Sequence, residues 1–103
     1  MSESLFKTSL KNTLLKRFPG SMVIHLDPTD IQGVPDLLVL IGPYWFALEG
    51  KRSENASHRP NQQYYVDKMD SMSFARFIYP ENMEEVLDEI ERTLLERGVD
   101  NEI

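Results

Sequence analysis

The run Leu37–Ile41 is the feature that most constrains the fold of this chain. Five consecutive apolar residues have the length of a β-strand, and no charged residue interrupts them, which is typical of a buried strand. Gly42-Pro43-Tyr44 breaks the run, and an extended pattern resumes over Trp45–Glu49. Two such runs around a short Gly-Pro turn predict a β-hairpin.

Apolar spacing and turn residues predict the remaining elements. The expected elements are, in chain order, a helix over Leu5–Phe18 capped by Ser2 or Ser4, a strand over Met22–Leu26, the hairpin, a helix from Pro60, a strand over Phe74–Tyr79 and a helix over Met83–Leu95. This order predicts an α/β fold with a mixed central sheet flanked by helices. The strands on either side of the middle helix should be parallel.

The length of 103 residues allows one domain with one hydrophobic core. We expect that domain to span residues 1–98, with Gly98 closing the last helix, and residues 99–103 to form a tail. Two polar loops, Asp27–Gly33 and Arg52–Pro60, connect the elements. The inner face of the middle helix is expected to carry one of Tyr64 and Tyr65, with Val66, Met69 and Met72.

Composition excludes several classes of protein and site. Cysteine is absent, which excludes disulfides, thiolate metal sites and cysteine nucleophiles. Neither His25 nor His58 has a partner at metal-ligand spacing, so a zinc site is not expected. No stretch reaches the roughly eighteen apolar residues that a membrane span needs. We therefore expect a cytoplasmic protein without a membrane partner.

The net charge of −6 is unevenly distributed. From Glu81 onward nine acidic residues accompany two arginines, which leaves residues 1–80 with a net charge of +1. The excess acidity therefore lies in one C-terminal block, and the C-terminal helix should point away from a phosphate backbone or cover the sheet. The candidate DNA contacts are five basic residues of the remainder, Lys7, Lys11, Arg52, Arg59 and Lys68.

Two carboxylates and an ammonium are expected at the open end of the hairpin. A hairpin centred near Pro43 places Asp36 opposite Gly50, with Glu49 and Lys51 diagonal to it. Mg²⁺ is usually held by one or two carboxylates together with phosphate oxygens. The Gly50 carbonyl is a further candidate ligand. The lysine can orient or deprotonate a water, or stabilise developing negative charge, so the grouping suits phosphodiester hydrolysis.

The same residues resemble a known family. Gly33-Val34-Pro35-Asp36, a hydrophobic strand and then Leu48-Glu49-Gly50-Lys51 resemble the pattern of the PD-(D/E)XK nuclease superfamily. Downstream, Arg59-Pro60-Asn61-Gln62 resembles the glutamine motif of its VRR-NUC branch, in particular the stand-alone, phage-type domains of similar size. With the order of elements, the likeness extends to about residue 80.

The resemblance implies a restriction-endonuclease-like αβββαβ core with an extra C-terminal helix. It implies a DNA endonuclease with Mg²⁺ or Mn²⁺ bound by Asp36 and Glu49, Lys51 as a catalytic residue, and a substrate of four-way or related branched DNA. Gln62 fits the motif better than Gln63, and Glu3 is the one acid in the first helix that could match an additional metal ligand of the superfamily. Phage-type relatives imply action in the cytoplasm of a host cell.

Assembly as a homodimer is also expected, because two-fold symmetry would present two sites to a symmetric junction. Trp45, Phe46 and Phe74 are available for the subunit contact, although a buried core explains them equally well. Tyr44 and Trp45 at the hairpin turn could instead stack on bases.

Other interpretations of the same residues stay open. Glu49 and Lys51 could form a cross-strand ion pair worth only about 0.2–1 kcal/mol, and Glu3 could be a carboxylate favoured by the helix dipole. The chain could also be a catalytically silent DNA-binding relative, or an interaction module whose acidic helix docks a basic partner. The burial of carboxylates at the end of an apolar strand argues against the ion-pair interpretation, because unpaired buried carboxylates are costly.

Overall fold

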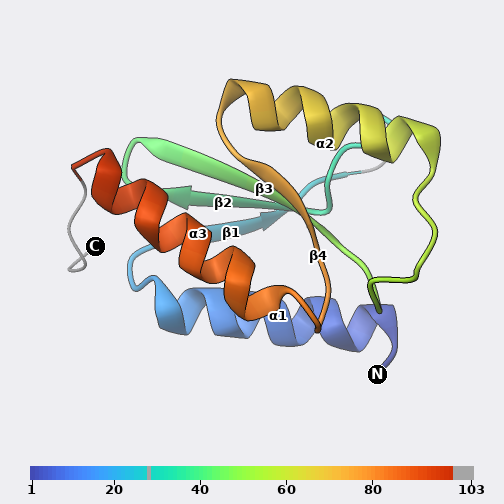
Figure 1. Cartoon of the computed structure of the whole chain (residues 1–103), viewed down its shortest axis with the longest axis horizontal. Helices are drawn as coiled ribbons and strands as arrows, with labels where there is room; N and C mark the ends of the chain where they lie inside the picture. Colours follow the sequence, from blue (N-terminus) through green and yellow to red (C-terminus); the bar gives the residue numbers. More distant parts are fainter. Residues whose placement is uncertain (28, 99–103) are drawn as a thin grey trace.

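A computed structural model of the protein describes residues 1–27 and 29–98, so the predicted tail at 99–103 lies outside the described residues. The elements are, in chain order, α1 (Glu3–Arg17), β1 (Met22–His25), β2 (Leu37–Ile41), β3 (Tyr44–Gly50), α2 (Pro60–Met72), β4 (Ala75–Ile78) and α3 (Met83–Glu96) (Figure 1). The side chain of Ser2 caps α1 by accepting a hydrogen bond from the Leu5 amide at 3.2 Å. The order predicted from the sequence is confirmed.

The four strands lie in chain order across one sheet. β1 pairs with β2 and β2 with β3 in the antiparallel sense, while β3 pairs with β4 in the parallel sense across the α2 connection. The sheet is therefore mixed, and the α/β class with helices on both of its faces is as expected.

The hairpin register differs by one residue from the prediction. Ile41 pairs with Tyr44 and Leu37 pairs with Leu48, so the next position, Asp36, faces Glu49 and not Gly50. The reason is the length of the turn. Only Gly42 and Pro43 lie between the strands, and Gly42 takes the positive φ of 57° that so tight a turn favours.

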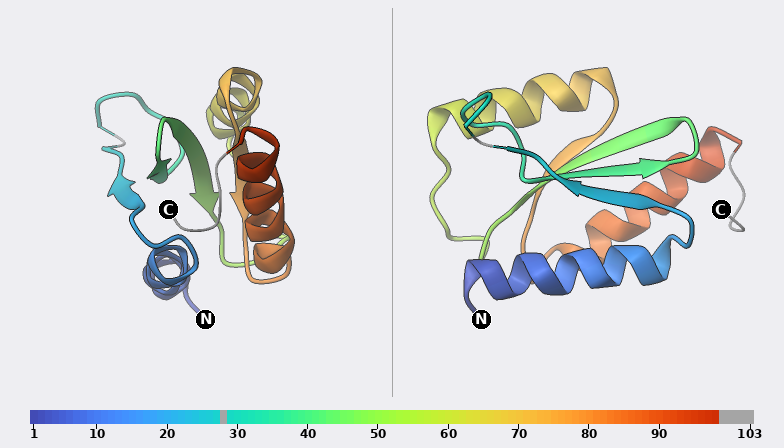
Figure 2. Two further views of the ribbon diagram at one scale, coloured as in Figure 1. Left: turned by 90° about the vertical axis from the view of Figure 1, so that its left-hand side faces the viewer. Right: turned by 180° about the vertical axis from the view of Figure 1, so that it is seen from behind.

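One face of the sheet carries the main hydrophobic core. Alternate residues of β2 turn to this face, and α1 and α3 pack over it (Figure 2). Its fully buried members include Leu10 and Leu14 of α1, Leu37, Val39 and Ile41 of β2, and Leu87 and Ile90 of α3. On the other face α2 lies over β3 and β4, around the small cluster of Ala47, Val66 and Ala75.

The structure decides between the two interpretations that were open for Phe46 and Phe74. Both belong to the main core, where their rings meet edge to face with centroids 5.3 Å apart, so neither is available for a subunit contact. Met72, expected on the inner face of α2, is 67% exposed. This expectation is wrong because Met72 borders an open hollow beside Leu38, Leu40 and Trp45 and is not covered there.

The acidic helix α3 covers the sheet, and four of its acids are paired with arginines of neighbouring elements. Arg17 of α1 forms ion pairs with Glu84, Asp88 and Glu91. Arg76 of β4 pairs with Glu89 at 3.0 Å and also with Asp70 of α2. None of the helices in the described part of the chain is both long enough and apolar enough to cross a membrane.

Candidate active site

Asp36 lies at the open end of the hairpin, one residue before β2, and its orientation is fixed on three sides. Its main-chain carbonyl accepts a hydrogen bond from the Leu26 amide at 2.8 Å. Its carboxylate oxygen Oδ2 accepts one from the Gly50 amide at 3.0 Å and lies 3.0 Å from Nζ of Lys7. The Asp36 carboxylate is therefore held against the end of β3 by a main-chain donor and by a cation from α1.

Glu49 faces Asp36 from β3 and is 2% exposed. Burial, together with the charge of Asp36 and a hydrogen bond to it, raises the pKa of Glu49 to about 8, and the charges of Lys51 and Lys7 oppose this without reversing it. Both effects disfavour a second negative charge next to Asp36. Near neutral pH Glu49 therefore keeps its proton, beside the Asp36 carboxylate that Lys7 holds.

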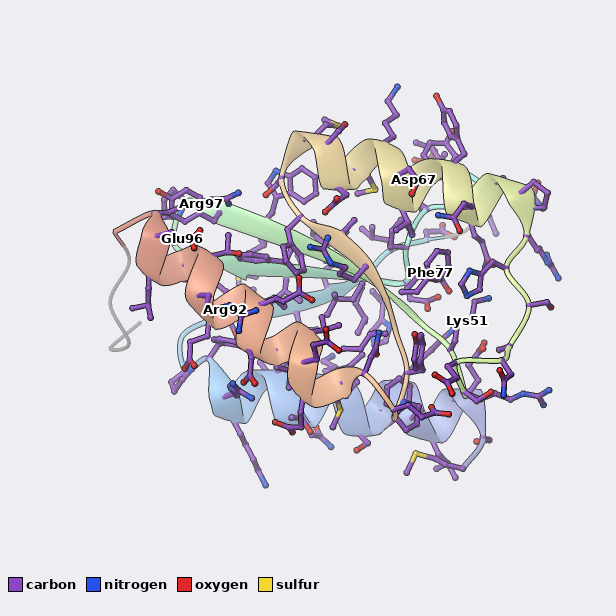
Figure 3. All side chains as sticks on the ribbon, in the orientation of Figure 1. Lys51, Asp67, Phe77, Arg92, Glu96 and Arg97 are labelled. Carbon is purple, nitrogen blue, oxygen red and sulfur yellow. The ribbon has the colours of Figure 1, made fainter. Side chains whose placement is uncertain are left out.

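Lys51 directly follows β3 and is 7% exposed. Its Nζ donates a hydrogen bond to Oε1 of Gln62 at 2.9 Å, and Figure 3 shows it between the end of β3 and the segment that leads to α2. No carboxylate of the described residues lies within ion-pair distance of Nζ. This argues against a cross-strand ion pair with Glu49, and it leaves a buried ammonium held by an amide oxygen.

The glutamine that reaches the site is Gln62. Its Oε1 also accepts a hydrogen bond from the Arg59 amide at 3.1 Å, so the same side chain caps α2 and contacts Lys51. Gln63 is exposed and donates to Asp67 on its own helix at 2.9 Å. The capping position at the start of α2 thus determines which of the two neighbouring glutamines faces the sheet.

Lys7 has a role that sequence reasoning missed. Expected as a surface contact, it lies between two carboxylates, with Nζ 3.0 Å from Asp36 and 3.4 Å from Glu3. Burial alone would lower the pKa of Lys7, but the hydrogen bond and the charge of Asp36 outweigh it and raise that pKa. Glu3, one helical turn earlier, is linked to Asp36 only through this lysine.

Gly50 makes room for Lys7. A Cβ on Gly50 would lie 3.0 Å from Cγ of Lys7, so only a residue without a side chain lets the lysine cross the end of β3 without a shift. The one sequence signal for Lys7 is its place beside Phe6 and Leu10 on the buried side of α1. That signal does not say which strand α1 covers.

Gly33 joins the loop before β2 to the start of α2. It has φ of 98°, and a Cβ there would lie 2.8 to 2.9 Å from atoms of Asn61. Beside this contact is a hollow of about 230 Å³, lined among others by Asp36, Glu49 and Gln62. The glycine of the Gly-x-Pro-Asp pattern therefore has a packing role that brings Asp36 and the first turn of α2 to one hollow.

The other predicted residues are spread over the surface. Arg52 and Arg59 lie on the segment between β3 and α2, close to Lys51. Lys11 lies one turn beyond Lys7 on α1, and Lys68 is on α2, with its Nζ 5.8 Å from the ring of Tyr64. Tyr44 donates a hydrogen bond to the Arg97 carbonyl at 3.1 Å, so the hairpin turn is tied to the end of α3.

The ligand set at the open end consists of two carboxylates. Among residues 1–27 and 29–98, no group of three or more histidine, aspartate or glutamate side chains is arranged to hold a metal ion. Asp36 and Glu49 are brought together, Glu3 is not grouped with them, and Gly50 contributes its amide to Asp36. Any further metal ligand at this place would be a water, a substrate oxygen or a main-chain carbonyl.

Comparisons of the chain with protein-family models and with curated proteins find no match.

Proposed function

We propose that the protein is a divalent-metal-dependent endonuclease that hydrolyses DNA phosphodiester bonds. The observation that carries the proposal is the convergence of Asp36, Glu49 and Lys51 at the open end of the hairpin. A buried and a half-buried carboxyl group beside a buried lysine without an ion-pair partner are an expensive arrangement for stability alone. Such groups are retained where charge has to be bound or stabilised.

The donor set fits Mg²⁺ or Mn²⁺. Asp36 and Glu49 offer hard oxygen ligands, and burial and mutual repulsion raise the pKa of Glu49 to about 8, which a divalent cation between the two groups would reverse. Asp36 and Glu49 would hold the ion, and the remaining positions suit water and phosphate oxygens. When bound, the ion supplies charge neutralisation at the scissile phosphate and a more acidic bound water.

The protein's own groups have distinct tasks at this site. Lys51 offers its positive charge to the scissile phosphate or to the attacking water. Gln62 positions Lys51 through the bond of 2.9 Å to its Nζ. The Gly50 amide and Lys7 hold Asp36 in its orientation from two sides. These contacts preorganise the charged groups before a substrate arrives, which is where such sites gain most of their rate.

The order of elements supports the same assignment. The sequence resembles the PD-(D/E)XK superfamily, and the resemblance implies an αβββαβ core with the acidic and lysine residues on the second and third strands. The observed order through β4 agrees with that core, and α3 is the additional helix. The proposed fold family is therefore the restriction-endonuclease-like one, with branched DNA as the proposed substrate.

The proposed DNA-facing side is the one that carries Arg52 and Arg59. Both residues are exposed and belong to the segment that borders Lys51. Four acids of α3, Glu84, Asp88, Glu89 and Glu91, are paired with Arg17 or Arg76 on other elements, which weakens the alternative of an acidic docking helix. Binding through exposed cations should weaken steeply as salt is added.

A second copy of the chain is the proposed partner. We define the apolar face by Met22, Ile24, Leu38, Leu40 and Trp45, continued by Met69 and Met72 of α2. Seen from behind, no helix of the described chain crosses β1 and β2 (Figure 2, right), and a hollow of about 310 Å³ opens beside them. A two-fold contact that packs this face against the same face of the second copy would cover it.

The dimer is tested by measuring mass in solution at micromolar concentration. Ile24→Glu should give a monomer, since it places a charge within the contact. Leu95→Glu is the matched control, because Leu95, like Ile24, is an exposed branched aliphatic residue but lies on α3. A strict monomer that still cuts both strands of a four-way junction would contradict the dimer.

The activity is tested with nicked, flapped, linear and four-way DNA, each with Mg²⁺, with Mn²⁺ and with a chelator. Metal-dependent cleavage of a branched substrate is expected. Binding of DNA without cleavage in any metal would favour the catalytically silent relative. Failure to bind DNA, together with no affinity for Mg²⁺ or Mn²⁺ in a titration, would favour an interaction module.

A further inference from the structure

A second hollow, separate from the one that Asp36 and Glu49 line, borders Lys51. It has a volume of about 480 Å³ and opens between the start of α1 and the segment from β3 to α2. Its lining residues are Met1, Ser2, Glu3, Lys51, Arg52, Ala56, Ser57 and Arg59. We call it the basic pocket. Arg59 lines both this pocket and the smaller hollow that holds Asp36 and Glu49, so the two are adjacent.

The charge of the basic pocket is positive. Three cationic side chains, Lys51, Arg52 and Arg59, line it beside one carboxylate. That carboxylate, Glu3, is already paired with Lys7 at 3.4 Å. The pocket also borders the first turn of the 15-residue helix α1, whose positive dipole end adds to the attraction for an anion.

The Lys51 ammonium has hydrogen-bond donors to which the described structure gives no acceptor. Its side chain has three donors, and the described structure gives it one hydrogen bond, to Gln62. With 7% exposure, it has little access to water for the other two. A buried ammonium without an anionic partner is costly, and an anion seated in the basic pocket would lie against it.

We propose that the basic pocket binds a phosphate group, adjacent to the phosphate that the carboxylates would take. Guanidinium groups bind phosphate oxygens through paired, charge-assisted hydrogen bonds, and two arginines line this pocket beside a lysine. That the phosphate belongs to a nucleic-acid strand rests on the proposed function. It is either an internal phosphodiester of that strand or a terminal phosphomonoester.

The binding test uses metal-free protein in chelator and inorganic phosphate as the probe, followed by amide chemical shifts. Phosphate should shift the amides of Arg52, Ser57 and Glu3 around the pocket. Arg52→Gln should weaken this binding by about tenfold, since one charge-assisted contact is lost. Arg52 is exposed, so the fold should tolerate the change. Lys16→Gln is the matched control, because it removes the same charge from the far end of α1.

The source of the phosphate is distinguished with two single-stranded oligonucleotides that differ only in a 5′-terminal phosphate. If the terminal phosphate is bound, it tightens binding to the wild type, and Arg52→Gln removes that gain. If an internal phosphate is bound, Arg52→Gln weakens both oligonucleotides equally. Either result supports the pocket. Equal phosphate binding by the wild type, Arg52→Gln and Lys16→Gln overturns it.

The test separates this inference from the proposed function, because it needs neither metal nor cleavage. If the pocket binds phosphate but the protein cuts no DNA, the phosphate site stands and the proposed nuclease activity is rejected. If the protein cleaves DNA with metal but the amides around the pocket do not shift on addition of phosphate, the nuclease activity stands and the phosphate site is rejected.

Discussion

At its turn the β2–β3 hairpin ends in aromatic side chains, and at its open end it carries buried charged groups. At the turn, Tyr44 packs against the main core, donates a hydrogen bond to the Arg97 carbonyl and stacks its ring under the Arg97 guanidinium, 4.9 Å from the ring centroid. At the open end, Asp36 and Glu49 face each other and Lys51 is buried beside them. The same two strands therefore carry a stabilising end and an end that costs stability.

The difference shows where function is to be sought in this molecule. At the turn the Tyr44 hydroxyl has a hydrogen-bond acceptor in the Arg97 carbonyl. Removal of this contact should reduce stability and leave the cleavage rate unchanged. Contacts at the open end leave a buried acid, Glu49, that keeps its proton near neutral pH, and a lysine ammonium with one acceptor. Changes there should therefore affect activity strongly, and some of them should increase stability.

The largest expected effect follows from removing a charged group at the open end. Asp36→Ala, Glu49→Ala and Lys51→Ala should each lower metal-dependent cleavage by on the order of 10²-fold to 10³-fold or more, because charge stabilisation in the transition state is lost. Each variant should still fold, as judged by circular dichroism. Full cleavage by a folded Asp36→Ala protein would falsify the site.

The pH dependence of stability gives the next effect. The pKa of Glu49 is raised in the folded protein from the ordinary 4.5 to about 8. Its protonated form therefore stabilises the fold below pH 4.5, and this contribution is lost as the pH rises through 8. Without metal, the free energy of unfolding should fall over this range by at most about 1.4 kcal/mol per pH unit.

Glu49→Gln isolates that contribution, because the amide keeps the shape of the acid and does not titrate. Thermal unfolding in chelator should show a flatter pH profile for the variant and a higher midpoint than the wild type near pH 8. Mg²⁺ should raise the midpoint of the wild type there and leave the variant unchanged. Parallel profiles for the two proteins would contradict the assigned pKa.

Gln62 tests the link between the site and α2. Gln62→Ala should lower cleavage by roughly tenfold, since Lys51 loses the acceptor that positions it, and should leave affinity for metal nearly intact. Because Gln62 also caps α2, about 1 kcal/mol of stability should be lost as well, so rates are compared well below the unfolding midpoint. Gln63→Ala is the matched control. If Gln63→Ala lowered the cleavage rate and Gln62→Ala did not, the assignment of this role to Gln62 would be wrong.

The smallest effect is expected at the turn. Tyr44→Phe removes the hydroxyl that donates to Arg97 and keeps the ring, which should cost about 1 kcal/mol in urea unfolding. Cleavage by the folded variant should equal that of the wild type. A fall in rate comparable with that of Gln62→Ala would mean that the two ends of the hairpin are not separate.

Local patterns in the chain allowed most of the fold to be predicted. The apolar run Leu37–Ile41, the Gly-Pro turn and the alternation of helix and strand patterns predicted every element in its order. The register failed by one residue, because the pattern does not say whether Tyr44 belongs to the turn or to the strand. Phe46 and Phe74 were open to two interpretations, since a large apolar side chain has the same pattern in a core and in an interface.

For the candidate site, the sequence by itself determined which groups come together along the hairpin. Asp36 and Glu49 are neighbours because short-range pairing around one turn leaves little freedom of register. Only the tertiary structure decided what surrounds them. Lys7 reaches Asp36 because α1 packs across the end of β3, and Gln62 reaches Lys51 because the first turn of α2 lies against Gly33. Such contacts depend on how whole elements pack, and no local pattern of residues encodes that packing.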